Sequence, residues 1–63
     1  MEINTVKLQK EMARHSLTYY GLALALGMRP WNIRYILEKK STRLSTIQKI
    51  ADYFDIDAKD LLK

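Results

Sequence analysis

LTYYGLALALGMRPWNIRYIL, residues 17–37, is the most informative stretch of this 63-residue chain. Thr18 stands where a helix would begin, because its hydroxyl can accept a hydrogen bond from a free amide of the first helical turn. Gly27 suits the left-handed residue that often ends a helix, and Pro30 is tolerated at the first position of the next one. The stretch therefore predicts a helix, a short turn, and a further helix over about 30–38.

The apolar residues of this stretch have the spacing that two closely crossing helices require. Ala23 is small enough to let the helices approach each other, and Gly27 accepts a backbone conformation that other side chains resist. The larger residues recur three or four positions apart, which places them on one face of each helix. We expect four of them to lock the angle between the two helices: Leu22, Leu26, Ile33 and Ile36. Leu37 is also expected to face inward.

Helical spacing continues on both sides of this stretch. We expect a first helix after a cap at Asn4 or Thr5, and a fourth over about 44–54. A short last helix, capped by Asp57, would carry Leu61 and Leu62. No long alternating segment or hairpin turn indicates a strand, so the sequence predicts an all-α single domain of five short helices over the whole chain. The expected inward residues outside 17–37 are Val6, Leu8, Met12, Ala13, Leu44, Ile47, Ile50, Ala51 and Phe54.

The charge of the chain is positive and unevenly distributed. Eleven Lys and Arg oppose seven Asp and Glu, which gives a net charge of +4 and a sequence pI near 9.6. Residues 1–50 hold nine basic and three acidic side chains, whereas residues 51–63 hold two basic and four acidic ones. A small domain this basic is a candidate for polyanion binding. The alternative is that the charge serves only solubility.

Several classes of protein are disfavoured by composition. There is no cysteine and only one histidine, His15, so neither a disulfide framework nor a zinc site is expected. The longest uncharged run, 16–28, is shorter than the roughly 20 apolar residues of a membrane span, and the N-terminus lacks the pattern of a signal peptide. We therefore expect a cytoplasmic protein. No catalytic constellation or phosphate-binding loop is present, so we expect no enzyme, no cofactor and no small-molecule substrate.

Residues 17–37 resemble the helix-turn-helix of the Cro/repressor-type (XRE-like, lambda-repressor-like) family, the DNA-binding domain of phage repressors. A second segment, QKIADYFDID at 48–57, followed by Asp60-Leu61-Leu62, is similar to the fourth and fifth helices of that family. The resemblance covers residues 6–62, with the helix-turn-helix at about 18–38. It implies a compact five-helix fold and a bacterial cytoplasmic regulator that binds double-stranded DNA.

The resemblance also implies roles for individual residues. The third helix would enter the major groove, where Arg34 suits guanine, Asn32 suits adenine or a phosphate, and aromatic rings suit thymine methyl groups. The implied base contacts are Arg29, Trp31, Asn32, Arg34 and Tyr35. The implied phosphate contacts are Thr18, Tyr19, Tyr20, Lys39, Lys40 and Arg43. As alternatives, Trp31 is a packing residue over the start of the helix, and Arg29 and Arg34 are merely solvated charges.

The chain departs from the family pattern at several positions. Tyr19 stands where a glutamine is common, and Met12 and Leu37 replace a frequent buried Arg–Glu pair. Apolar replacement of such a pair is physically reasonable. Pro30 and Trp31 replace the small or polar residues that are usual at the groove-facing start of the third helix, and Lys39 replaces the glycine that usually closes it.

Family analogy implies a repressor that binds a pseudo-palindromic operator as a homodimer. The analogy places the dimer contact around Arg43, Asp55 and Ile56. A second interpretation is a protein-binding module on the same fold, antirepressor-like or antitoxin-like. It rests on Tyr20 and Leu24, which form an apolar strip on the second helix. The alternative is that the first helix or residues 1–3 cover this strip.

Overall fold

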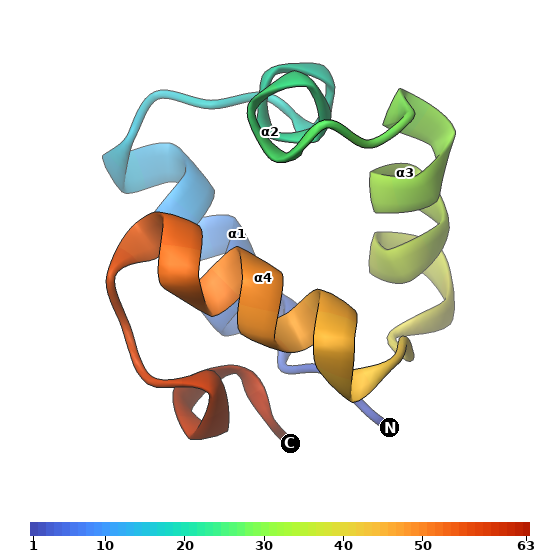
Figure 1. Ribbon diagram of the computed structural model, residues 1–63, viewed down its shortest axis with the longest axis vertical. Helices are drawn as coiled ribbons and strands as arrows, with labels where there is room; N and C mark the ends of the chain where they lie inside the picture. The colour runs from blue at the N-terminus through green and yellow to red at the C-terminus, as the bar shows by residue number, and fades with distance from the viewer.

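The computed structural model describes all residues, 1–63. The elements are four α-helices, α1 (Thr5–Arg14), α2 (Tyr19–Leu26), α3 (Pro30–Lys39) and α4 (Leu44–Phe54), and a 3₁₀ helix η1 (Ala58–Leu61) (Figure 1). The all-α prediction is confirmed, but the expected fifth α-helix is this single 3₁₀ turn. Asp57 precedes it without a side-chain cap, and the carbonyl of Asp57 instead accepts from the amide of Asp60 at 3.0 Å.

The ends of the first three helices follow from local chemistry. The side chain of Asn4 accepts from the amide of Lys7, and the hydroxyl of Thr18 accepts from the amide of Gly21, each at 3.1 Å. Gly27 has a φ of 69°, and a Cβ added there would meet nothing within 4 Å, so the backbone conformation alone favours glycine. These predicted caps and the α2 stop are confirmed. Helix α3 begins at Pro30 as predicted and continues one residue beyond the predicted end at 38.

Thirteen buried apolar side chains form one core, to which every helix contributes. Three predicted inward residues of the flanking helices are exposed instead: Val6, Ala13 and Leu44. The core face of α1 is set by Leu8 and Met12, and a helical turn of 100° per residue places Val6 and Ala13 on its outer side. Leu44 is the first residue of α4 and is only partly covered. None of the helices combines the length and apolar character that crossing a membrane requires.

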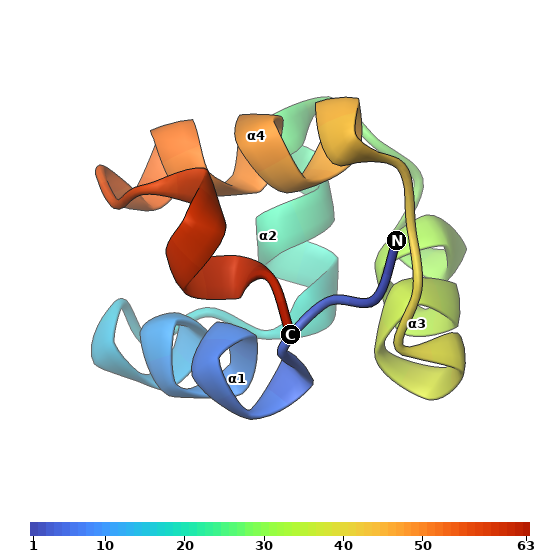
Figure 2. The same cartoon turned by 90° about the horizontal axis from the view of Figure 1, so that it is seen from below.

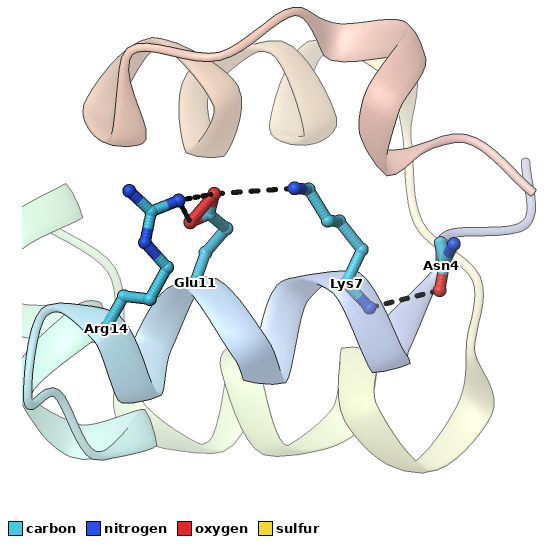
Figure 3. Close-up of polar contacts among 4 residues, drawn as sticks. All are labelled: Asn4, Lys7, Glu11 and Arg14. Carbon is cyan, nitrogen blue, oxygen red and sulfur yellow. Dashed lines mark hydrogen bonds and ion pairs between the residues drawn. The ribbon is translucent and has the colours of Figure 1, made fainter.

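A buried carboxylate completes the inner face of α1. Glu11 is only 1% exposed. Its two oxygens accept from Nη1 of Arg14 at 2.9 and 3.0 Å, and one of them lies 3.5 Å from Nζ of Lys7 (Figure 3). The sequence analysis did not predict this residue. Burial of the charge is tolerated because both cations come from the same helix and satisfy both oxygens.

The N-terminal residues are held between two segments distant in sequence. The amide of Ile3 donates to the carbonyl of Lys40 at 3.0 Å, and the amide of Thr42 donates to the carbonyl of Met1 at 2.9 Å. On the other side, the amide of Asn4 donates to the carbonyl of Leu61 at 2.7 Å. Figure 2 shows the N-terminal segment running between the loop after α3 and the C-terminal end. Residues 1–3 therefore lie on the loop after α3 and not on α2.

Candidate nucleic-acid interface

Helices α2 and α3 are joined by a tight turn over residues 27–29. The amide of Met28 donates to the carbonyl of Ala23 at 2.8 Å, and the amide of Asn32 donates to the carbonyl of Arg29 at 2.9 Å. Ala23 is fully buried, which fits the close crossing of the two helices. The predicted helix-turn-helix is therefore present, and Figure 1 shows α3 at the edge of the molecule beside α2.

The outer face of α3 is left uncovered by the rest of the chain. Its inner side carries Ile33 and Ile36, which are buried, whereas Leu37 is only partly buried. On the opposite side Trp31 is 60% exposed and Tyr35 is 58% exposed. Trp31 is therefore not a core residue. The five residues predicted to contact bases are all exposed: Arg29, Trp31, Asn32, Arg34 and Tyr35.

Two shallow hollows mark this surface. One, of about 420 Å³, lies on α3 itself and is lined by Trp31, Asn32, Arg34, Tyr35 and Glu38. The other, of about 440 Å³, lies between α3 and the start of α4 and is lined by Met28, Asn32, Tyr35, Ile36, Thr42, Arg43 and Thr46. Asn32 and Tyr35 line both hollows, so the surface is continuous from α3 to the start of α4.

Each aromatic ring on α3 has a cation over it. The guanidinium carbon of Arg29 lies 5.1 Å from the ring centre of Trp31, and Nζ of Lys39 lies 6.0 Å from the ring centre of Tyr35. Both distances fall in the range of cation–π attraction. The predicted base-contact residue Arg29 therefore lies beside Trp31, and the predicted phosphate-contact residue Lys39 lies beside Tyr35.

Glu38 is a member of this surface that the sequence analysis missed. Its carboxylate oxygen lies 3.6 Å from Nε of Arg34, with both side chains exposed. It is the only acidic residue between 29 and 43, a segment that holds five Lys and Arg. Helical geometry gave a signal, because Glu38 is seven positions after Trp31 and so lies on nearly the same side of α3.

The predicted phosphate-contact residues lie on elements that adjoin α3. At the start of α2, Thr18 caps the amide of Gly21, while the amides of Tyr19 and Tyr20 have no intrahelical partner because they belong to the first turn. After α3, Lys40 is exposed in the left-handed region with φ 58°. Arg43 occupies the N-cap position of α4, an end that no side chain caps.

The residues predicted for partner contacts do not form one patch. Arg43 precedes α4 and Asp55 follows it, so about 18 Å of helix separates them. Ile56 is partly buried beside Asp55. Tyr20 and Leu24 on α2 are 55% and 62% exposed. Because residues 1–3 are paired elsewhere, they do not cover this strip, nor does α1.

Comparison with known families finds one match. A family model described as Cro/C1-type HTH DNA-binding domain matches residues 7–63, nearly the whole chain. No curated protein and no solved structure matches the chain. The matched segment includes α2, α3 and every residue discussed above as a candidate contact to DNA.

Proposed function

Because the chain belongs to the Cro/C1-type helix-turn-helix DNA-binding family, we propose that it is a sequence-specific transcriptional regulator, a repressor of the phage Cro or immunity type. It places α3 in the major groove of a pseudo-palindromic operator. The observation that carries this proposal is the uncovered outer face of α3, with Trp31 and Tyr35 more than half exposed. By occupying its operator the protein blocks polymerase or a competing regulator in the bacterial cytoplasm.

Base recognition is assigned to polar and apolar groups on the same helix face. Nε of the Arg34 guanidinium lies 3.6 Å from the Glu38 carboxylate, and its terminal nitrogens donate to O6 and N7 of guanine. Asn32 lines both hollows and pairs with adenine or a phosphate oxygen. Arg29, at the start of α3, approaches the DNA together with Trp31.

Phosphate binding is assigned to the two ends of the helix-turn-helix. The free amides of Tyr19 and Tyr20 lie at the positive end of α2 and take one phosphate. Lys39, Lys40 and Arg43 follow α3 and take the neighbouring backbone. Each phosphate neutralised by the protein releases counterions, so binding must weaken steeply as salt is raised.

One copy of the chain spans too few base pairs for useful specificity. Two copies on half-sites one helical turn apart, about 34–36 Å, give the family's usual arrangement. The chain acts as one domain over residues 1–63 and as a homodimer on DNA. Arg43, at the start of α4, lines the hollow between α3 and α4. It is therefore nearer the DNA than Asp55 and Ile56, which follow the other end of α4.

The test is selection of binding sites from random duplex DNA by the native chain and by three variants. We expect a two-fold symmetric consensus, and we expect Arg34→Ala and Tyr35→Ala each to lose preference at defined bases. Lys10→Ala removes an exposed positive charge from α1 and serves as the control, with the consensus retained. A consensus unchanged in both α3 variants would refute the placement of α3 in the groove.

A second candidate function follows from the strip formed by Tyr20 and Leu24. These side chains are four residues apart, exposed, and apolar, which suits contact with another protein, as in an antirepressor or antitoxin. A salt titration separates the two functions, since apolar association does not weaken as salt rises. If Leu24→Glu leaves self-association, partner binding and folding unchanged, the strip has no such role.

A further inference from the structure

The outer face of α3 carries two exposed aromatic rings, Trp31 and Tyr35. Trp31 and Tyr35 are four residues apart, so their rings lie one turn from each other on the same side of the helix. They line the same shallow hollow of about 420 Å³, together with Asn32, Arg34 and Glu38. No segment of the chain covers either ring.

Each of the two rings has a cation close to it. The guanidinium carbon of Arg29 lies 5.1 Å from the centre of the Trp31 ring, and Nζ of Lys39 lies 6.0 Å from the centre of the Tyr35 ring. Each cation also places positive charge next to its ring. The apolar part of the hollow is formed by the two rings, and its polar part by Asn32, Arg34 and Glu38.

The chemistry of the major groove limits what such a centre can bind. The base edges there present nitrogen and oxygen acceptors, amino donors, and one apolar group, the C5-methyl of thymine. A cytosine methylated at C5 carries the same group at the same position of its ring. The polar side chains of the hollow can pair with the donors and acceptors, but its two aromatic rings have only this methyl group as an apolar partner.

We propose that the hollow between Trp31 and Tyr35 receives the C5-methyl group of a pyrimidine that lies next to the guanine bound by Arg34. The inference rests on the proposed function, because it requires α3 to lie in the major groove. Arg34 immediately precedes Tyr35 and lines the same hollow, so the two contacts fall on neighbouring bases. The operator thus contains a methylated pyrimidine, thymine or 5-methylcytosine, adjacent to guanine in each half-site.

The experiment changes the methyl group alone. In the operator obtained by selection, each thymine is replaced in turn by uracil, which pairs identically but lacks the methyl. At one position in each half-site, next to a guanine, we expect about fourfold weaker binding, the effect of exposing one methyl-sized group. At that position a C·G pair is then compared with and without a C5-methyl. If the methyl group strengthens binding only in thymine, the hollow is specific for thymine. If it strengthens binding in both pyrimidines, the hollow accepts the C5-methyl of either base.

Protein variants locate the effect. Trp31→Ala and Tyr35→Ala are compared with Tyr53→Ala, which removes a partly exposed tyrosine from α4. The thymine–uracil difference is expected to shrink in the two α3 variants and to persist in the control, with folding checked by circular dichroism. Persistence of the difference in both α3 variants would overturn the proposal.

The outcomes separate this inference from the proposed function. Failure of the native chain to bind any duplex selectively would refute the function itself. Selective binding in which uracil equals thymine at every position would overturn the methyl site while leaving the function intact. Neither result depends on a variant, because both are measured with the native chain.

Discussion

Replacement of Lys40 by glycine should stabilise the fold and weaken DNA binding at the same time. Lys40 ends α3 in the left-handed region with φ 58° and ψ 29°, where a residue with a Cβ is disfavoured by about 1–2 kcal/mol. Glycine removes that strain but has a more flexible unfolded chain, which offsets about 0.5–1 kcal/mol. The expected net gain is therefore about 0.5–1 kcal/mol, or roughly 2–8 °C in Tm for a domain of this size.

The native backbone bonds of this residue survive the change. The amide of Lys40 donates to the carbonyl of Ile36 at 2.8 Å, and its own carbonyl accepts from Ile3; glycine keeps both. The exposed side chain makes no ion pair within the protein, so its loss should lower the affinity for DNA without lowering the stability of the fold. We expect uniformly weaker binding to all duplexes and a salt slope smaller by about 1.

The assays are thermal unfolding followed by circular dichroism and duplex titrations at several salt concentrations. Asp55→Gly is the matched control for stability, because Asp55 ends α4 with φ 56°. Aspartate tolerates this region better than lysine, so its gain should be smaller. A loss of stability in Lys40→Gly would refute the strain argument, and an unchanged salt slope would refute the placement of this loop beside the phosphate backbone.

Three further predictions concern other parts of the molecule. Glu38→Gln should raise the affinity for non-operator DNA up to about fivefold near 0.15 M salt, because removing a negative charge that repels the phosphates acts like one added phosphate contact. The control Asp52→Asn, at the far end of α4, should leave this affinity unchanged. Equal effects of the two variants in salt-dependent titrations would contradict the placement of Glu38 at the DNA. Gly27→Ala should lower the free energy of unfolding by about 1 kcal/mol, measured in urea, through backbone strain alone. Ile33→Ala should cost about 2–5 kcal/mol because Ile33 is fully buried; a loss below 1 kcal/mol would show that α3 is not anchored by it.

Local signals in the sequence predicted most of the fold. Asn4, Thr18, Gly27 and Pro30 fix helix ends through bonds or backbone preferences within a few residues, so they can be recognised without the tertiary structure. The short last helix was predicted with the wrong geometry, because four residues are too few for periodicity to distinguish a 3₁₀ turn from an α-helix. The predicted burial of Val6 was wrong because Val6 lies two residues before Leu8, a separation of about 200° that places the two side chains on opposite sides of the helix.

The remaining features depend on contacts between distant segments or on charge. The hydrogen bond between Ile3 and Lys40 links residues 37 positions apart, and neither segment has a sequence pattern that predicts it. The ion pairs of Glu11 with Lys7 and Arg14 make its burial tolerable, but the same spacing of charges also occurs on exposed helices and therefore does not predict burial. The outer face of α3 was predictable from its inward residues, whereas a carboxylate such as Glu38 does not attract DNA and is no signal of a DNA-binding surface.

The loop after α3 is not helical, but it is fixed by backbone hydrogen bonds to a distant part of the chain. The carbonyl of Lys40 and the amide of Thr42 are both bonded to residues 1–3, and the next residue, Asn4, donates to the carbonyl of Leu61. The loop is therefore held in place through the N-terminal residues, so amide exchange at Thr42 should be slowed by this contact and should become faster when residues 1–3 are removed. Little conformational entropy is then left to lose when its cations meet an anionic surface, and association gains from that preorganisation.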